Sequence, residues 1–581
     1  MYIIEDYSRS NSMKILILLL SLAYFVSMAN AETFYIAPTG SSDSYPGTQI
    51  QPWATLQKAI ETVQAGDTVY CRGGTYYPTV YQHGHDVFYY VPEDGYGNSG
   101  TANSRICYIN YPGETPVIDF STFSVATFNV GVYMRGVHHV TFKGLTFQNL
   151  PKASPGPNAM TIETRACSYL HFEQLVIKNG GGAALRYFSG IGEDVGIFSD
   201  TVRIINCDFF NNVDSAGNHA DGLKYDQDVG AYLLVQGCRA MFNSDDGFDC
   251  SGSAVRVFKN NWAFGQGWVP GGNGNGFKAG AVRDSVGYPL LIFINNLSAY
   301  NHEENNGGFG FDIVDQRRQD GDSLYYRANA RFYNNTACRS DINFEANSNS
   351  LHDYRIDVYR NNIAYNPRYF QDVWVNVQIT GFPYPESHNT WDYEEGNYSF
   401  VETDTVTVTE EDFVMTDSAL AVAELMAARD SDGSLPELTF MQLASTSDLI
   451  DAGTANGWDE FADYYGIGPI TYNGSAPDIG FMEYTTYNQL THQNPVLKIG
   501  SHVNMYPNPA CDYVRVSLKE PAQKGDIIQI VNLKGAVMYN RKVNPHVKVL
   551  TISVDFNSGI YIVQLVSENR ILSTQKLMVD R

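Results

Sequence analysis

The sequence predicts an all-β protein, in which a parallel β-helix solenoid is followed by a small β-sandwich. The composition is the first reason: Tyr (40), Phe (31) and Gly (51) are abundant and only 17% of the residues are charged. This mix is typical of β-rich extracellular proteins. The second reason is a strand–bend–strand unit that recurs along the chain with no amphipathic helix in each repeat. A chain of 581 residues exceeds the size of one compact core, and a solenoid accommodates that length because each coil contacts only its neighbours.

An export signal is predicted over residues 1–31. A basic residue precedes an apolar run over residues 15–26, and a small-x-small cleavage pattern ends at Ala31. The run is too short to span a bilayer comfortably, so we expect it to be removed after Ala31. Met1 and Met13 are both candidate start residues. Because no other segment is apolar enough to cross a membrane, we expect a secreted or cell-surface protein without a membrane span.

Residues 32–487 are expected to form the solenoid. The segment 33–76 has the pattern of a strand, a short helix and a second strand. It resembles the N-terminal capping coil of secreted right-handed β-helix proteins, which is needed because an open end coil would expose the core. At the other end, residues 449–453 and 477–484 are expected to be the final coils. Residues 390–440 are expected to be an insertion that contains a helix.

Pairs of asparagine mark the repeat. They begin at positions 260, 295, 334 and 361, and each pair stands between two short apolar strands. The interval varies between about 27 and 39 residues, which is the irregular period of a β-solenoid. Asparagines at equivalent bends can stack, with each side-chain amide bonding the one in the next coil. We therefore expect an asparagine ladder along one corner of the solenoid.

A linker over residues 488–501 and a small β domain over residues 502–581 are predicted to end the chain. The domain opens on a Tyr-Pro-Asn-Pro motif that starts at Tyr506, and strand-like segments follow as far as Val579. The pattern resembles the C-terminal sorting domains of the type nine secretion system of Bacteroidota. The resemblance implies that the type nine secretion machinery is a partner. The alternative is an ordinary carbohydrate-binding sandwich.

Acidic turns in the centre of the chain carry the functional signal. Asp221 lies in His-Ala-Asp-Gly, Lys278 lies in Gly-Asn-Gly-Phe-Lys, and the motif Asn-Ser-Asp-Asp-Gly-Phe-Asp supplies Asp245, Asp246 and Asp249. The first two acidic turns are about one coil apart, which would place them on neighbouring rungs of one face. Four clustered carboxylates repel one another unless a divalent cation neutralises them, and oxygen-rich acidic clusters suit calcium. The alternative is a set of ordinary polar β-turns rich in Asp and Gly.

These motifs, in this order, resemble those of polysaccharide lyase family nine, the β-helix pectate lyases, over roughly residues 140–370. The resemblance implies that Lys278 is the Brønsted base and that calcium (Ca²⁺) is bound by four aspartates, Asp221, Asp245, Asp246 and Asp249. The implied reaction is a β-elimination, in which a base removes the C5 proton of a uronate and the 4-oxygen leaves. The expected substrate is an acidic plant polysaccharide, and the sequence does not distinguish polygalacturonate from rhamnogalacturonan.

Five further residues are candidates for binding substrate, with ordinary surface or structural positions as the alternative: Lys224, Tyr225, Asp312, Arg317 and Arg318. The net charge of −25 argues against nucleic acid or an anionic membrane surface as a partner. We expect a monomer. The eight cysteines match neither a metal site nor a dense disulfide framework. Cys207 and Cys238 are expected to be small buried residues rather than a bridge.

Three other functions fit parts of the pattern. A β-helix pectic glycoside hydrolase, such as a polygalacturonase, also places paired aspartates in a groove. It would leave Lys278 without a role, and the Arg-Ile-Lys motif of that family does not follow downstream. An epimerase shares the C5 proton step and returns a proton from the other face. A non-enzymatic surface adhesin with structural calcium would keep the aspartates without a reaction.

Overall fold

The computed structural model confirms the predicted fold class: parallel sheets stacked as a solenoid, then a small antiparallel domain. It describes the residues 31–153, 159–188, 201–227, 232–252, 255–280, 282–283, 290–303, 307–314, 325–326, 329–348, 358–368, 373–377, 386–390, 408–456, 471–485, 503–506, 513–532, 537–556, 559–567 and 570–579. The predicted linker and all but the last residue of the predicted export signal lie outside these ranges. Within them, no helix is long and apolar enough to cross a membrane.

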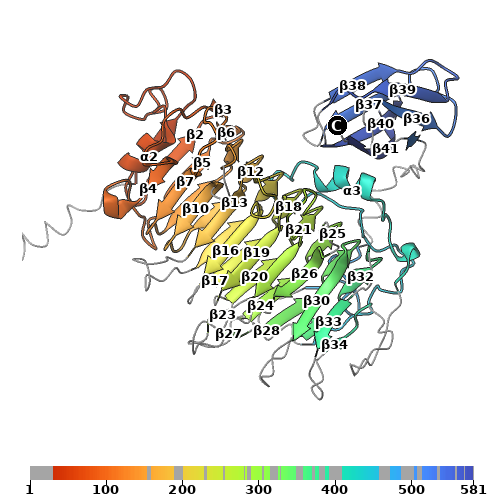
Figure 1. The fold of residues 1–581 in the computed structure, drawn as a ribbon. Coiled ribbons are helices and arrows are strands. Elements are labelled where there is room, and N and C mark those ends of the chain that lie inside the picture. The colour runs from red at the N-terminus through yellow and green to blue at the C-terminus, as the bar shows by residue number, and fades with distance from the viewer. Residues whose placement is uncertain are drawn as a thin grey trace, which may run out of the picture.

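The solenoid consists of three parallel sheets, and successive coils add one strand to each (Figure 1). Sheet A contains β1 (Thr33–Ile36), β2 (Thr68–Cys71), β5 (Ile106–Asn110), β8 (Val140–Lys143), β11 (His171–Glu173), β14 (Val202–Ile205), β17 (Tyr232–Gln236), β20 (Val255–Lys259), β24 (Leu290–Ile294), β28 (Asn329–Tyr333), β31 (Val358–Arg360) and β34 (Glu386–Ser387). Sheet B contains β3 (Gly74–Tyr76), β6 (Pro116–Asp119), β9 (Thr146–Gln148), β12 (Val176–Lys178), β15 (Asp208–Phe210), β18 (Arg239–Met241), β21 (Trp262–Phe264), β25 (Leu297–Ala299), β29 (Thr336–Cys338) and β32 (Ile363–Tyr365).

Sheet C contains β4 (Asp86–Tyr90), β7 (Asn129–Arg135), β10 (Ala159–Arg165), β13 (Ala183–Phe188), β16 (Leu223–Gln227), β19 (Phe248–Gly252), β22 (Phe277–Gly280), β26 (Phe309–Val314), β30 (Ile342–Ser348) and β33 (Val373–Val377). A short antiparallel pair, β23 (Val282–Arg283) with β27 (Tyr325–Tyr326), lies outside the three sheets.

Alternation along the strands of sheet C fills the interior of the solenoid. Phe248, Phe277, Phe311 and Phe344 are buried and stack in order, with ring centroids 4.9, 4.8 and 4.9 Å apart. This spacing matches the distance between neighbouring strands, so the stacked rings follow the sheet from coil to coil. Because successive side chains of a strand point to opposite faces, the residue after each inward ring faces outward. These outward positions hold the candidate site.

The predicted asparagine ladder is confirmed. The second asparagine of each pair donates its amide to the next: Asn261 to Asn296 at 3.0 Å, Asn296 to Asn335 at 2.9 Å, Asn335 to Asn362 at 3.0 Å, and Asn362 to Asn389 at 2.9 Å. The first asparagine of each pair has a left-handed backbone with φ between 53° and 57°, which asparagine tolerates better than most residues. The ladder therefore fixes the corner between sheets A and B.

The two cysteines expected to stack do so without a bridge. Cys207 and Cys238 are buried and free, and the backbone N–H of Cys207 donates to Cys238 Sγ at 3.3 Å. Each acts as a small core residue, as predicted.

A helix closes the N-terminal end, where a helix is expected. The helix α2 (Leu56–Thr62) begins after Thr55, whose side chain accepts a hydrogen bond from the backbone N–H of Lys58. Its buried apolar residues, Leu56, Ala59 and Ile60, belong to the solenoid core. A 3-10 turn, η1 (Pro92–Asp94), follows β4.

Residues 408–456 pack on the outer side of sheet B and contain the helix expected in the insertion. That helix, α3 (Ser418–Leu425), follows the 3-10 turn η3 (Glu410–Asp412) and lies beside β18 and β21 in Figure 1. Leu425 and Phe440 share an apolar cluster with Phe264 of β21. The segment therefore covers apolar side chains that sheet B would otherwise expose.

The expectation that residues 449–453 and 477–484 are final coils is wrong. Neither segment contains a strand in the described part of the chain. Instead, the backbone N–H of Phe481 donates to Thr336 Oγ1 at 3.1 Å, and the amide of Asn334 donates to the carbonyl of Asp478 at 2.8 Å. The segment 477–484 thus docks on the side of the solenoid. The segment 449–453 is bonded to it, with the Ile479 N–H donating to the Leu449 carbonyl at 3.0 Å and the Gly453 N–H to the Pro477 carbonyl at 2.7 Å. Their apolar residues resemble those of a coil because they cover an apolar side of the solenoid.

The predicted C-terminal β-sandwich is confirmed. One antiparallel sheet has the order β35 (Val503–Tyr506), β36 (Tyr513–Leu518) and β39 (Val549–Ser553). The other has the order β38 (Val537–Lys542), β37 (Ile527–Asn532), β40 (Gly559–Ser567) and β41 (Arg570–Val579). Alternate residues of both sheets share one apolar core, as two packed sheets require.

Candidate active site

Sheet C brings predicted site residues onto neighbouring strands. Lys224 of β16 is in register with Asp249 of β19, Asp249 with Lys278 of β22, and Lys278 with Asp312 of β26. Asp249 and Lys278 each follow an inward-pointing phenylalanine, so this register position faces outward. We call Lys224, Asp249, Lys278 and Asp312 the charged row.

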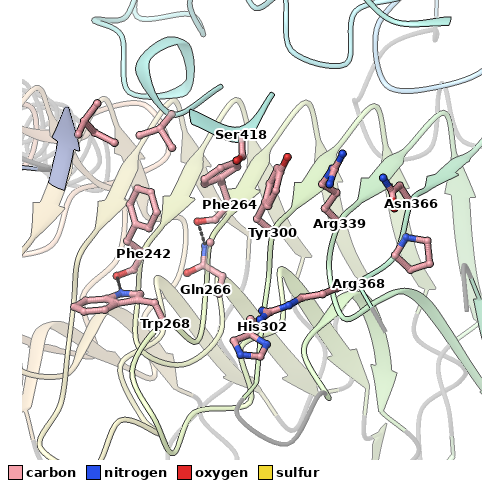
Figure 2. A pocket seen from close by; sticks show the side chains of 14 residues that line it. Phe242, Phe264, Gln266, Trp268, Tyr300, His302, Arg339, Asn366, Arg368 and Ser418 are labelled. Atoms are coloured by element: carbon pink, nitrogen blue, oxygen red, sulfur yellow. Dashed lines mark hydrogen bonds between the residues drawn. The ribbon is translucent and has the colours of Figure 1, made fainter. Parts of the chain in front are cut away.

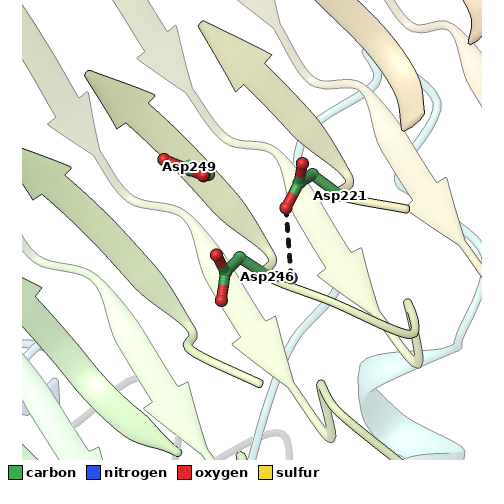
Figure 3. A group of neighbouring side chains, drawn as sticks. All are labelled: Asp221, Asp246 and Asp249. Atoms are coloured by element: carbon green, nitrogen blue, oxygen red, sulfur yellow. Dashed lines mark hydrogen bonds between the residues drawn. The ribbon is translucent and has the colours of Figure 1, made fainter. Parts of the chain in front are cut away.

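Three more aspartates stand in the turns that lead into these strands. Asp221 precedes β16, and Asp245 and Asp246 precede β19. One carboxylate oxygen each of Asp221, Asp246 and Asp249 lies within 4.8 Å of the other two (Figure 3). The backbone N–H of Asp246 donates to Asp221 Oδ1 at 3.2 Å, which ties the two coils together. Asp245, the fourth predicted ligand, is next to Asp246 in the chain but does not belong to this close group of three. We call Asp221, Asp245, Asp246 and Asp249 together the aspartate cluster.

The glycine-rich loop before β22 holds the cluster through its backbone. The N–H of Asn273 donates to Asp245 Oδ1 at 2.7 Å, and the N–H of Asn275 donates to Asp246 Oδ1 at 2.8 Å. The loop can approach because Gly274 has φ +65° and because a Cβ at Gly276 would lie 2.0 Å from Ser298 Oγ. The glycines of the motif were visible in the sequence, but the two backbone donors were not.

Two lysine amines stand at the edge of the cluster. Lys278 Nζ lies 2.9 Å from Asp246 Oδ2 and 3.6 Å from Asp249 Oδ2. Lys224 Nζ hydrogen-bonds to Asp249 Oδ2 and lies 3.8 Å from Asp221 Oδ2. The side chains of Lys278 and Lys224 are 15% and 27% exposed, whereas that of Asp249 is 4% exposed. A molecule on the outer face of sheet C therefore meets the lysines before it meets the carboxylates.

The pKa values of the aspartate cluster show that its negative charges are not fully balanced by the two neighbouring lysines. Burial, together with neighbouring carboxylates, raises the pKa of Asp221 to about 8 and that of Asp245 to about 9. Burial alone would also raise the pKa of Asp249, but Lys224 and Lys278 outweigh it and lower that pKa. Burial would lower the pKa of Lys278, but Asp246 and Asp249 outweigh it and raise that pKa. Without a further cation, the cluster retains protons on part of its carboxylates.

The donor set fits a hard divalent cation. The cluster supplies buried carboxylate oxygens from two neighbouring coils, which is the ligand type that calcium prefers. Asp249 Oδ1 is buried and has no hydrogen-bond partner among the residues that the structure describes. A buried acceptor without a donor is costly, and a cation would satisfy it.

The stability of the metal-free protein should fall as pH rises from about 4 to about 9. In the folded state Asp221 and Asp245 have pKa values of about 8 and about 9 instead of 3.8. The folded protein therefore holds more protons than the unfolded chain in this window, and the free energy of unfolding falls with pH. Calcium should flatten this dependence, because it binds the ionised carboxylates of the folded state. Melting temperatures against pH, with chelator and with calcium, measure both slopes.

The difference between the two slopes isolates the cluster. Burial also raises the pKa of Asp86 and of Glu483 to about 7, but these carboxyls lie outside the cluster and contribute equally in both conditions. Equal slopes with chelator and with calcium would contradict a cation site at the cluster.

The remaining predicted substrate residues divide into three groups. Tyr225 does not line the site: it is 0% exposed, packs in the core and stacks on Tyr187 at 5.2 Å. The reason is alternation, because Lys224 beside it points outward. Asp312 is in the charged row, and its Oδ2 accepts a hydrogen bond from the Asn275 amide at 3.4 Å. Arg317 and Arg318 lie outside the described residues.

A separate cavity of about 510 Å³ lies between the strand ends of sheet B and the segment that carries α3 (Figure 2). The described residues that line it include no member of the aspartate cluster or of the charged row. Phe242, Tyr300 and Arg339 line it with left-handed backbones, φ 55°, 55° and 52°. Tyr300 Oη donates to the carbonyl of Thr416 at 3.2 Å. Tyr300 thus anchors the covering segment, and the aspartate cluster and the charged row are on sheet C instead.

Relatives are found for both domains. Residues 34–362 match the family model of the Pel9A-like, right-handed β-helix region, and residues 504–580 match that of the secretion system C-terminal sorting domain. The second match indicates secretion or delivery to the cell surface, as predicted. Pectate lyase L of Dickeya dadantii is 27% identical over 467 residues, which cover 78% of this chain and 90% of the relative. Pectate lyase PEL9 of Emericella nidulans is 27% identical over 304 residues, 47% of this chain and 68% of the relative.

Two solved structures share the solenoid. Pectate lyase Pel9A superposes with a TM-score of 0.58 at 24% identity and covers 79% of this chain and 98% of its own. A rhamnogalacturonan lyase superposes with a TM-score of 0.53 at 26% identity and covers 71% and 97%. Since the matched family model spans more than half of the chain, this protein belongs to the family of Pel9A-like right-handed β-helix proteins and ends in a secretion system sorting domain.

Proposed function

We propose that this protein is a secreted, calcium-dependent polysaccharide lyase that cleaves uronate-containing pectic polymers by β-elimination. The observation that carries the proposal is the position of Lys278. Its amine lies on the outer face of sheet C, 2.9 Å from Asp246 and 3.6 Å from Asp249. A lysine amine and a buried carboxylate cluster therefore stand side by side, which supports a base next to a cation site.

The metal site would be formed by the aspartate cluster: Asp221, Asp245, Asp246 and Asp249. Calcium bound there would attract the carboxylate of a uronate and stabilise the negative charge that develops when the adjacent C5 proton is removed. The cluster is rigid, because backbone donors of Asn273 and Asn275 fix Asp245 and Asp246. Preorganised ligands of this kind need no rearrangement during the reaction.

Lys278 would act as the base. The C5 proton moves to Nζ, the C–H electron pair forms the double bond between C4 and C5, and the 4-oxygen leaves with its own pair. The pKa of Lys278 is raised because Asp246 and Asp249 outweigh burial. Lys278 can therefore act as a base only if a bound cation neutralises these carboxylates. The base and the cation site are coupled for this reason.

A glycoside hydrolase is less well supported. It would use a pair of carboxyl groups and no lysine base. The amine of Lys278, 2.9 Å from Asp246 and 3.6 Å from Asp249, would then have no role. The names of the relatives, pectate lyase and rhamnogalacturonan lyase, agree with the lyase proposal and leave two pectic polymers as substrates.

The purified protein should generate unsaturated uronides from a pectic polymer, and a chelator should abolish this activity. The product is measured by its ultraviolet absorbance with polygalacturonate and with rhamnogalacturonan, before and after chelation, and again after calcium is restored. A protein that binds calcium but yields no unsaturated product from any uronate polymer would support the adhesin instead. Reducing sugar released without ultraviolet absorbance would support a hydrolase.

A further inference from the structure

On the N-terminal side of the aspartate cluster, the outer face of sheet C is basic and aromatic. Arg186 of β13 is in register with Lys224, and Arg165 of β10 is in register with Phe188 of β13. The guanidinium carbons of Arg186 and Arg165 lie 5.0 and 5.5 Å from the centre of the Phe188 ring, and that of Arg165 lies 5.8 Å from the Tyr133 ring. We call Tyr133, Arg165, Arg186 and Phe188 the arginine platform.

A buried carboxylate holds one arginine of the platform in place. Arg165 Nε donates to Glu163 Oε1 at 2.6 Å, and the Glu163 side chain is 0% exposed whereas that of Arg165 is 31% exposed. The buried carboxylate fixes one guanidinium, and the rings of Phe188 and Tyr133 support its faces. Because rotation is already restricted, an incoming anion loses little of its binding energy in ordering these side chains.

The charge of the platform is opposite to that of the protein as a whole. The chain has 38 Lys and Arg against 63 Asp and Glu. In contrast, the outward positions of β10 and β13 carry two arginines and one carboxylate, that of Glu163. On the other side of Lys278, the next position of the charged row is Asp312. The face is therefore asymmetric: it attracts anions toward the N-terminal coils and offers a carboxylate in the opposite direction.

We propose that Arg165 and Arg186 bind the carboxylates of successive uronates in the part of the substrate that extends from the lyase centre toward the N-terminal coils. This inference rests on the proposed function. Planar guanidinium groups bind carboxylates through paired hydrogen bonds, and the two arginines are on neighbouring strands. A polymer of consecutive uronates, such as polygalacturonate, offers a carboxylate to each, whereas a polymer that alternates uronates with neutral sugars offers fewer.

The platform should be reached only by long substrates. Arg186 on β13 lies three strands from Lys278 on β22, which is about 14 Å at the usual strand spacing. A short oligogalacturonate that occupies the lyase centre does not span this distance. Affinity should therefore rise with the length of the oligogalacturonate. The two arginines should contribute to this rise and not to the binding of short oligomers.

The experiment compares four full-length proteins that all carry Lys278→Ala to prevent turnover: the parent, Arg186→Ala, Arg186→Lys and Arg203→Ala. Arg203 is the matched control, because it is exposed on β14 of sheet A. Calorimetric titration with calcium and oligogalacturonates of increasing length should show about tenfold weaker binding of long oligomers to Arg186→Ala. Short oligomers should bind all four alike, Arg186→Lys should lose less, and Arg203→Ala should match the parent.

Three results would overturn the subsite: equal affinities of Arg186→Ala and the parent at every length, a loss that is the same for short and long oligomers, or an equal loss in Arg203→Ala. Melting temperatures show whether each variant is folded. If Arg186→Ala is unfolded, Arg165→Lys replaces it in the comparison, because lysine keeps a positive charge beside Glu163. The titration does not depend on catalysis. A wild-type protein that binds long oligomers through Arg186 but forms no unsaturated product would reject the lyase and keep the subsite.

Discussion

Lys278→Ala should lower kcat by about 10²–10⁴-fold or more, while calcium and substrate still bind. The substitution removes the amine that lies 2.9 Å from Asp246 and leaves all four aspartates in place. It also removes a positive charge from the metal-free cluster, so calcium affinity should be retained or increased. Initial rates from the absorbance of unsaturated product give kcat, and calorimetry gives calcium and oligosaccharide affinity. A variant that loses calcium binding together with activity would show that Lys278 is needed for the site rather than for the proton transfer.

Lys278→Arg separates proton transfer from charge. Guanidinium keeps the positive charge but does not deprotonate in the working pH range, so this variant should be nearly as inactive as Lys278→Ala. If Lys278→Arg kept most of its activity, lysine would be an electrostatic stabiliser. The next candidate for the base would be Lys224, the other amine that contacts the cluster, and Lys224→Ala would then show the loss of kcat.

Asp245→Asn should remove the calcium response while leaving the metal-free protein at least as stable as the wild type. Burial and Asp246 raise the pKa of Asp245 to about 9, so its carboxyl is already protonated at neutral pH when no metal is bound. Asparagine has the same shape, is neutral and can still accept the hydrogen bond from the Asn273 N–H. With calcium at 100 times the wild-type Kd, ligand binding stabilises the wild type by about 2.7 kcal/mol. Most of this increment should be missing from the variant in calorimetric melts, together with lyase activity.

Asp119→Asn is the matched control. Asp119 is also a buried aspartate, but it belongs to β6 of sheet B and accepts hydrogen bonds from Gln148 at 2.7 Å and Asn149 at 2.8 Å. Replacing it should lower the melting temperature equally with and without calcium, because it lies outside the cluster. If Asp245→Asn retained the full calcium increment and Asp119→Asn lost it, the cation would bind elsewhere.

Features that depend on local sequence could be predicted. The asparagine ladder follows from a motif that repeats at one bend of each coil, so aligning Asn261 with Asn296 is enough to place both. The aspartate cluster is similar, because Asp221 and Asp246 lie in the turns before neighbouring strands of sheet C and Asp249 follows in the strand itself.

Features that depend on register and on long-range docking could not be predicted. A shift of one residue in the register of β16 would exchange the outward positions of Lys224 and Tyr225. The register of such a short strand cannot be predicted from the sequence to within one residue. The contact between Lys224 and Asp249 depends on that register, and the arginine platform depends in the same way on the registers of β7, β10 and β13. The lateral docking of Phe481 on Thr336 joins residues 145 apart in the chain, and an apolar segment on the outside of a solenoid has the same pattern as a coil.

Consecutive asparagines of the ladder, from Asn261 to Asn389, are 35, 39, 27 and 27 residues apart, yet their amides are all in hydrogen-bond contact. At Asn261, Asn296, Asn335 and Asn362 a strand of sheet A ends just before the asparagine and a strand of sheet B begins just after it, so the surplus residues lie in the loops on either side of sheet C. Insertions and deletions there leave the bonded corner untouched. The loops that border the outer face of sheet C can therefore change in length and sequence while the fold that carries the candidate site stays the same.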